Sequence, residues 1–252
     1  MTMTLDQIKS ISANQFATEQ QEAGQVTETT PSNITPAIDT FVKSLDAEAA
    51  QFLPVIADPN GLYGFCSDGV QEKIKVDGGR CVFGWSIWEW PDVMLTAEFH
   101  AIWEDVEGGR FDITPKPKNE SQILFVADLS YVENFDFDRR PRNRRKRIYV
   151  GADPVEAAAA AKAKLSEGQR KYEEKRAQKA ELNIDDWLMA KVPHDPLADT
   201  IDQLIKTCDE FDEHFDALGT AGTVAVDAKF RELALRRVGL QQQLKRQLNT
   251  LK

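Results

Sequence analysis

A cysteine, a histidine and an aspartate follow one another in an order that suits nucleophilic chemistry by a thiol: Cys66, His100 and Asp112. A thiol becomes a good nucleophile when it is deprotonated, and a helix N-terminus and a neighbouring imidazole both favour the thiolate. A carboxylate beside the other ring nitrogen fixes the tautomer and orientation of that imidazole. The same residues also suit a buried structural cysteine with a histidine at the edge of the core, so spacing alone leaves both interpretations open.

The catalytic interpretation requires three elements to meet. Cys66 follows the turn sequence DPNGLYGF, and Ser67-Asp68 predicts the cap of a short helix that runs to about Val76 and ends at Gly78-Gly79. His100 and Asp112 lie on predicted strands at 94–105 and 109–114. If these strands pair across the turn at 107–109, Asp112 lies within a residue or two of His100 or Ile102 in register.

Further aromatic and β-branched segments predict the sheet that carries these strands. We expect strands at 81–90 and 121–129, a turn followed by a strand over 108–115, and helices at 37–53 and 67–76. This arrangement is of the α+β class, a small antiparallel sheet packed on helices and followed by a helical C-terminal region.

Composition divides the chain into three regions. Residues 1–36 predict a flexible N-terminal segment, 37–150 the α+β thiol domain, and 151–252 a helical arm and a helical hairpin with heptad-like apolar stripes. The two stripes can bury each other, so the sequence predicts a separable C-terminal part. We expect it to bind a protein partner, or a second copy in a homo-oligomer, through residues 200–252.

Three phrases in order, GGRCVFGWSIWEW, AEFHAIWED and GGRFDITP, resemble the transglutaminase-like and papain-like thiol fold. They are most similar to a little-characterised bacterial and phage group with a GWxIWE…AEFHAxW…DITP core. The resemblance covers roughly residues 60–128. It implies that Cys66 is the nucleophile, His100 the base and then the acid, and Asp112 the orienting carboxylate. The segment YGFCSDGV lacks the Trp that commonly stands beside the cysteine in transglutaminase-like enzymes.

Other residues are weaker candidates for this site. An oxyanion needs a nearby donor, for which the backbone N–H of Cys66 and the side chain of Asn60 are candidates. The tryptophans of the predicted strands suit either a substrate groove or sheet packing, and the groove candidates are Trp88, Trp90 and Trp103. Cys81 is the rival nucleophile, but its place on a strand favours core packing. Cys208 on a helical stripe is expected to be a core residue.

The remaining features exclude several classes of function. Lys and Arg number 31 against 41 Asp and Glu, which gives a net charge of −10 and argues against a dedicated nucleic-acid binder. The basic run RRPRNRRKR at 139–147 is then expected to be a solvated loop neutralised by ENFDFD upstream. No segment suits a membrane span or a signal peptide, so we expect a cytoplasmic protein with reduced thiols. No spacing predicts a metal site or a cofactor.

The sequence therefore favours a thiol-dependent amide hydrolase, deamidase or acyltransferase that acts on a protein or peptide amide. A second hypothesis belongs to a different class. In it, the chain is a non-catalytic interaction protein that binds a partner through the helical hairpin and the basic loop.

Overall fold

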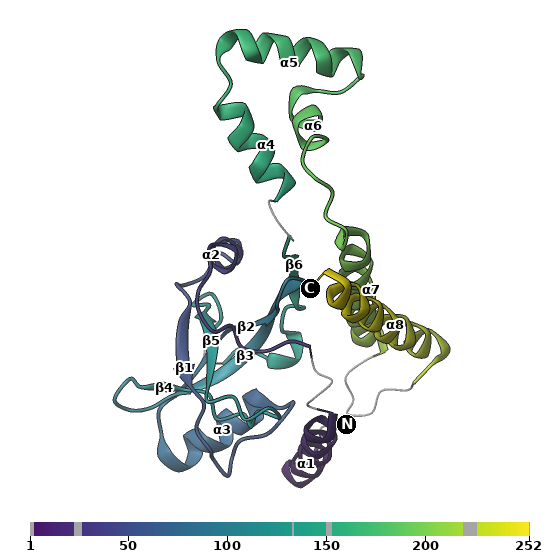
Figure 1. The fold of residues 1–252 in the computed structure, drawn as a ribbon. Helices are drawn as coiled ribbons and strands as arrows, with labels where there is room; N and C mark the ends of the chain where they lie inside the picture. The colour runs from purple at the N-terminus through teal and green to yellow at the C-terminus, as the bar shows by residue number, and fades with distance from the viewer. Residues whose placement is uncertain (1–2, 23–26, 133, 150–152, 219–225, 252) are drawn as a thin grey trace.

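The computed structural model describes residues 3–22, 27–132, 134–149, 153–218 and 226–251, and it has an α+β fold around a six-stranded antiparallel sheet (Figure 1). The strands lie in the order β1-β5-β2-β3-β4, and β6 also pairs with β3. Their bounds are β1 Gln51–Pro54, β2 Arg80–Trp90, β3 Met94–Glu104, β4 Arg110–Phe111, β5 Gln122–Ala127 and β6 Arg144–Arg147. The predicted fold class is confirmed.

The centre of the sheet is the long hairpin of β2 and β3. Its register runs from Arg80 opposite Glu104 to Trp90 opposite Met94. Because side chains alternate across a sheet, Phe83, Trp85 and Phe99 face one core while His100 faces the other side. The aromatic and β-branched composition of these strands predicted them within a residue at each end.

The outer edge of β3 has two short partners and a gap between them. β6 pairs with Met94–Ala97, whereas β4 pairs only with Trp103 and Glu104. The middle of β3, which carries His100, therefore has no partner strand on that edge among the described residues. Helix α3 (Cys66–Asp77) packs against β3, and this contact brings its first residue toward the sheet.

The predicted helix at 37–53 is wrong in its second half. Helix α2 (Pro36–Lys43) is capped by Thr35 and buries Ile38, Phe41 and Val42. The chain then turns, with Asp46 at a φ of 56°, and enters β1. Pairing of Phe52 and its neighbours with β5 outweighs the helical spacing that extended the prediction.

The predicted helix after the Cys66 turn is confirmed, but its start differs. The residue at the N-cap is Phe65, whose side chain makes no capping hydrogen bond, so Ser67 and Asp68 lie inside the first turn. The helix ends at Gly78-Gly79, both with positive φ. A Cβ at Gly79 would lie 2.2 Å from the Glu104 carbonyl oxygen, so glycine permits the tight return into β2.

The N-terminal segment, which was predicted to be flexible, contains a helix. Helix α1 (Leu5–Glu22) lies beside the end of the molecule that carries α3 (Figure 1). There the ring centroids of Phe16 and Tyr63 are 5.7 Å apart. Further along, Thr29 forms a β-bridge with Glu89. These contacts tie both described parts of the segment to the sheet domain.

The C-terminal region is helical, as predicted. Its helices are α4 Pro154–Ala163, α5 Glu167–Lys179, α6 Ile184–Met189, α7 Ala198–Leu218 and α8 Ala228–Leu251. Helices α4–α6 pack on one another and project away from the sheet (Figure 1). Ser166 and Gln169 form a capping box that separates α5 from α4, which the alanine-rich composition alone did not indicate.

Helices α7 and α8 form the predicted hairpin, but they do not stand apart from the sheet. Their apolar stripes share one buried cluster with the β2–β3 turn. The cluster consists of Trp90, Val93, Met94, Leu197, Ile201, Leu204, Cys208, Leu240 and Leu244. Helices α7 and α8 pack on each other, but residues of the sheet complete their core. The two apolar stripes are therefore not buried by each other alone, as the sequence had suggested.

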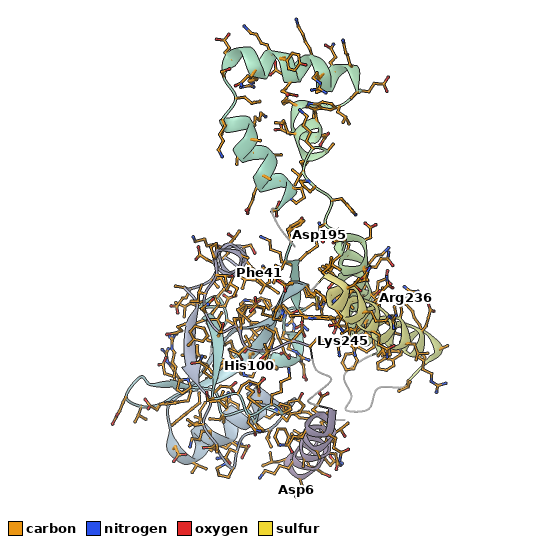
Figure 2. All side chains as sticks on the ribbon, viewed as in Figure 1. Asp6, Phe41, His100, Asp195, Arg236 and Lys245 are labelled. Atoms are coloured by element: carbon orange, nitrogen blue, oxygen red, sulfur yellow. The ribbon has the colours of Figure 1, made fainter. Side chains whose placement is uncertain are left out.

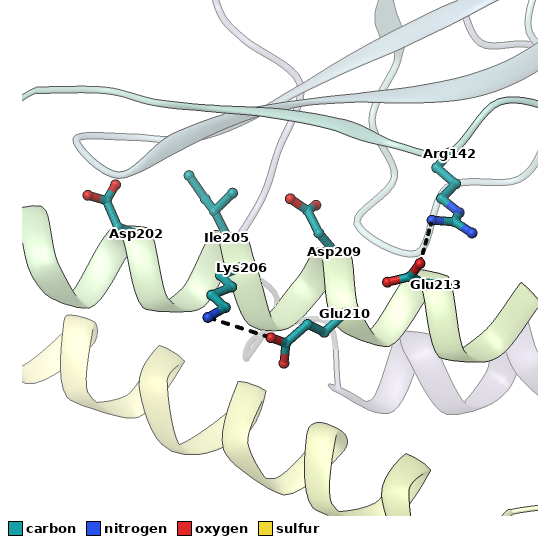
Figure 3. Close-up of a pocket in the computed structure, with 7 residues that line it drawn as sticks. All are labelled: Arg142, Asp202, Ile205, Lys206, Asp209, Glu210 and Glu213. Carbon is teal, nitrogen blue, oxygen red and sulfur yellow. Dashed lines mark ion pairs between the residues drawn. The ribbon is translucent and has the colours of Figure 1, made fainter.

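The basic run also differs from its prediction, because its second half is strand β6 and its charges face α7. Arg145 binds Asp209 and Asp212 at 2.7 and 2.8 Å, and Arg147 binds Asp202 at 2.8 Å. A shallow groove of about 370 Å³ runs along this interface, where Arg142 faces Glu213 (Figure 3). The acidic partner is thus a helix 55 to 74 residues downstream rather than the upstream ENFDFD segment.

Among the described helices, none combines the length and apolar character that a membrane crossing demands.

The docked hairpin leads to a prediction about Trp90, which is 5% exposed at the centre of the shared cluster. Trp90→Ala should lower the free energy of unfolding by about 3–5 kcal/mol, because it leaves a cavity between sheet and hairpin. Urea unfolding followed by circular dichroism at 222 nm measures this change. The matched control is Tyr172→Ala on α5, where the ring is 61% exposed and the expected effect lies within about 0.5 kcal/mol. Equal losses in both variants would contradict the docking.

Candidate active site

Cys66 lies at the first residue of α3 and at the wall of a cavity. Cys66 is 8% exposed to solvent. The helix places its positive dipole end and the N–H groups of its first turn at the sulfur. Phe65 at the N-cap makes no side-chain hydrogen bond to these N–H groups.

His100 lies inside the sheet domain (Figure 2), and both His100 and Cys66 line the cavity. Its Nε2 is 3.2 Å from Oδ2 of Asp112, although the two groups are not aligned for a hydrogen bond. The structure therefore brings Cys66, His100 and Asp112 together in the order that the sequence suggested.

Asp112 owes its position to two partners in the backbone. Pairing of Trp103 with Phe111 places Asp112 next in register to Ile102, as the sequence predicted. From there the chain leaves β3, and Asp112 bridges to the residues that follow β1. Its N–H donates to the Pro54 carbonyl oxygen, and its own carbonyl oxygen accepts from Ile56. The carboxylate is thus held at the gap in the β3 edge.

The Asp112 carboxylate is completely buried and has three neighbours. Its Oδ1 accepts the Thr114 N–H at 2.8 Å, which fixes the side chain in a tight turn. Its Oδ2 lies 2.6 Å from Nζ of Lys116 as well as 3.2 Å from His100. A buried charge is tolerated only with such partners, and here two cations share one anion.

These charges set the protonation of the site. Burial would raise the pKa of Asp112, but Lys116 and then His100 outweigh it and hold that pKa far below its usual range. Burial would likewise lower the pKa of His100, but Asp112 and Cys66 oppose burial and raise it to about 10. At neutral pH the ring is therefore an imidazolium beside the Asp112 carboxylate.

A cavity of about 510 Å³ opens onto this group. Its walls include α1, the cysteine turn, β2, β3, the loop 114–120, β6 and both helices of the hairpin. Cys66, His100, Thr114 and Lys116 all line it. Its volume is typical of a small-molecule or side-chain site. The N-terminal and C-terminal helices thus complete a cavity that the sequence assigned to residues 37–150 alone.

Only one of the predicted groove residues lines this cavity. That residue is Trp88, whose Nε1 donates to Glu98 at 2.9 Å. Trp90 belongs to the cluster under the hairpin, and Trp103 packs on Phe111 and donates to the Gly78 carbonyl oxygen. Asn60 does not line the cavity, and it hydrogen-bonds Asp58 instead.

The other two cysteines are placed as expected. Cys81 is 5% exposed and belongs to the main core of the sheet domain. Cys208 lies in the cluster under the hairpin, where burial raises its pKa to about 11. Both positions are typical of cysteines that act as small hydrophobic residues.

Two residues of the site escaped the sequence analysis. Lys116 follows Asp112 by four residues, directly after the DITP phrase, yet a lysine in a loop carries no signal until its burial is known. Thr114 belongs to the DITP phrase, in which no separate role was predicted for it. It lines the cavity, and its buried hydroxyl has no hydrogen-bond partner in the described structure.

No group of three or more His, Cys, Asp and Glu side chains within the described residues is arranged to hold a metal ion. Comparisons with protein-family models, with curated proteins and with solved structures found no match for this chain.

The high pKa of His100 leads to a prediction for its titration. Nitrogen-15 spectra of the ring should show an imidazolium at pH 8 with a midpoint at about 10. Because the folded pKa exceeds the unfolded value of about 6.5, this group stabilises the fold fully below that value, and its contribution is lost as pH rises through 10. Cys66→Ser should lower the midpoint, since one of the raising partners is removed. A wild-type midpoint near 6.5 would contradict the ion pair.

The shared carboxylate predicts the effect of removing Lys116. Lys116→Met should lower the free energy of unfolding at pH 7 by about 3–5 kcal/mol, because a buried charge loses a partner. The pKa of Asp112 should also rise. Its stabilisation, present above the unfolded pKa and lost as pH falls through the folded pKa, should then be lost at a higher pH.

Urea unfolding between pH 3 and 8 measures both effects of Lys116→Met. Lys75→Met on the exposed face of α3 is the matched control, with an expected change within about 0.5 kcal/mol. An acid limb of the stability profile that coincides with wild type would refute the role of Lys116 in holding the Asp112 charge.

Proposed function

We propose that the protein is a thiol-dependent amide hydrolase, deamidase or acyltransferase in which Cys66, His100 and Asp112 act together. One observation carries the proposal. A cysteine at a helix N-terminus shares a 510 Å³ cavity with an imidazolium, and Nε2 of that imidazolium lies 3.2 Å from a buried carboxylate. Such a thiol, imidazole and carboxylate are the parts that acyl transfer through a thioester requires.

In the first half of the proposed reaction, the Cys66 thiolate attacks the carbonyl carbon of the amide. A C–S bond forms, and the carbonyl oxygen becomes an oxyanion that the N–H groups at the start of α3 can stabilise. The His100 imidazolium then donates its proton to the departing nitrogen. The C–N bond breaks, and a thioester and an amine or ammonia result.

In the second half, water or an amine attacks the thioester while His100 accepts its proton. The C–S bond breaks and the thiolate is restored. The causes of the His100 pKa support this change of role. Cys66 is one of the two groups that raise it, and a thioester sulfur carries no charge. The pKa of the ring therefore falls at the step in which the ring must act as a base.

The interaction-protein alternative relied on the basic run and the hairpin as a surface for a partner. In the structure these two segments bind each other through Arg142, Arg145 and Arg147. The observations on that surface therefore favour an internal interface, and the enzyme remains our first proposal.

The proposal predicts that Cys66 is the most reactive thiol. With limiting iodoacetamide at pH 7, peptide mapping should show Cys66 labelled before Cys81 and Cys208, because only Cys66 combines a cavity with an imidazolium partner. His100→Ala should slow the labelling of Cys66 by roughly tenfold or more, since the thiolate loses its cation.

The matched control for that experiment is His194→Ala, which removes an exposed histidine outside the cavity and should leave the rate unchanged. Circular dichroism establishes that each variant is folded. Faster labelling of Cys81, or a rate at Cys66 that does not depend on His100, would rule out the proposed nucleophile.

A further inference from the structure

One carboxylate oxygen of Asp112 lies beside two cations. Nζ of Lys116 is 2.6 Å from Oδ2, and Nε2 of His100 is 3.2 Å from the same atom. Asp112 has no exposure, and His100 and Lys116 are 7% and 8% exposed. The three buried groups therefore carry one net positive charge while the ring is an imidazolium, and none once the ring is neutral.

Lys116 is held beside Asp112 by contacts that do not involve His100. It follows Asp112 by four residues, in the turn that the Thr114 N–H closes on Oδ1 of Asp112 at 2.8 Å. Its Nζ also lies 5.7 Å from the centroid of the Trp88 ring, whose face attracts a cation. These contacts do not depend on the charge of the His100 ring.

The two cations also act on each other. Because both approach Oδ2, Nζ of Lys116 and Nε2 of His100 are at most about 6 Å apart. Like charges at that separation in a buried site repel enough to shift a titration by about one pH unit or more. Lys116 therefore favours release of the proton from the His100 ring, whereas Asp112 opposes that release.

The proposed reaction requires the charge of His100 to change twice. The ring gives its proton to the departing nitrogen, and it later accepts one from the attacking water or amine. With Asp112 as its one charged neighbour, a neutral ring would leave a buried carboxylate without a cation, which is a costly state. With Lys116 in place, the carboxylate is paired in both states of the ring.

We propose that Lys116 is a positioning residue of the proposed enzyme, which keeps Asp112 ionised and paired while the His100 ring passes between its charged and neutral forms. The inference rests on the proposed function, because it concerns the proton transfers of that reaction. Lys116 acts through Asp112 and His100 and takes no proton itself. Its charge makes the imidazolium a better acid toward the leaving amine, and it allows the neutral ring to form and serve as the base.

The sulfur of Cys66 must be removed from the comparison before the effect of Lys116 is measured. Cys66 and Asp112 are the groups that raise the pKa of His100, to about 10. Cys66→Ser removes the first of these and, like the thioester of the proposed reaction, places no thiolate beside the ring. Asp112 and Lys116 are then the two charges that differ in sign at the ring.

The strands around His100 contribute further groups that stay constant in the comparison. The β2 residue opposite His100 is Gly84, which has no side chain. On β3 the next residue of the same face is Glu98, while β4 contributes Arg110 and β6 contributes Arg145. These three charged residues are present in every variant below, so their effects on the ring cancel.

The first test compares the ring titration of His100, by nitrogen-15 NMR, in Cys66→Ser and in Cys66→Ser/Lys116→Met. We expect the midpoint to rise by about one pH unit or more in the double variant, because the imidazolium loses a like charge. Loosened packing would act in the opposite direction, since water around the ring returns the midpoint toward the ordinary value of about 6.5. An equal or lower midpoint in the double variant would overturn the proposal.

Two control variants separate the charge of Lys116 from its shape and from charge in general. Cys66→Ser/Lys116→Arg keeps the positive charge, so its midpoint should stay within about 0.5 unit of that of Cys66→Ser. Cys66→Ser/Lys75→Met removes an exposed lysine of α3 and should leave the midpoint where it is in Cys66→Ser. A midpoint that rises as far with arginine as with methionine would contradict a role of the charge.

The second test follows the reaction itself, with p-nitrophenyl acetate as the acyl donor to Cys66. Mass spectrometry measures loss of the acetyl group as water attacks the thioester, the His100 ring takes the water proton and the C–S bond breaks. The rate in His100→Ala is subtracted at each pH. In Lys116→Met the pH midpoint of this hydrolysis should lie above that of wild type by about one unit or more, as for the ring. Coinciding midpoints would overturn the proposal.

Failure of the proposed function gives a different result. Wild-type Cys66 would then take up no acetyl group, or would lose it at the rate seen in His100→Ala. The ring titrations in the Cys66→Ser background do not depend on that outcome, and they test the effect of the Lys116 charge on His100 separately.

A measurement without any change at Lys116 covers the case in which its variants do not fold. In Cys66→Ser, the nitrogen-15 shift of the Lys116 Nζ and the carbon-13 shift of the Asp112 carboxylate are followed across the midpoint of the His100 ring. Both groups should remain ionised on either side of that midpoint. Loss of the Lys116 proton at or below the pH at which the ring titrates would overturn the proposal.

Discussion

The buried negative charge of Asp112 is the constraint on which the site depends. A carboxylate with no exposure is tolerated only among cations and N–H donors, and here His100, Lys116 and the Thr114 backbone supply them. Each partner is held by a different means: His100 by the long β2–β3 hairpin, and Thr114 and Lys116 by the turn that follows Asp112 itself. The anion in turn keeps the imidazole charged.

The gap at the edge of β3 is the second requirement. A continuous partner strand would cover the middle of β3, where His100 lies, and would separate it from α3. β4 stops after two residues because Asp112 turns away to bond with Pro54 and Ile56. β6 covers the other end and brings arginines to the acidic face of α7. The unpaired part of the β3 edge is therefore limited to the residues between these two short strands. A short unpaired edge also disfavours pairing with other chains.

The sequence predicted the central strands, α3 and the order of Cys66, His100 and Asp112, because aromatic alternation and turn residues are local signals. It did not predict β1, where Phe52 continued a helical spacing but pairs with β5. It also missed Lys116 and the docking of the hairpin through Trp90, since both depend on contacts between distant segments. The basic run was read as a solvated loop because its acidic partners, such as Asp209, lie far along the chain.

The origin of the cavity walls has a consequence for synthesis of the protein. All three members of the triad have emerged once Asp112 leaves the ribosome, yet Asp212 and Arg237 of the cavity follow only with the hairpin. At roughly 5–20 residues per second, that interval is on the order of ten seconds. During it, the nascent chain carries a thiol and an imidazole without the walls that select what reaches them. For the proposed enzyme, selectivity for a substrate is therefore acquired later in translation than the chemical groups themselves.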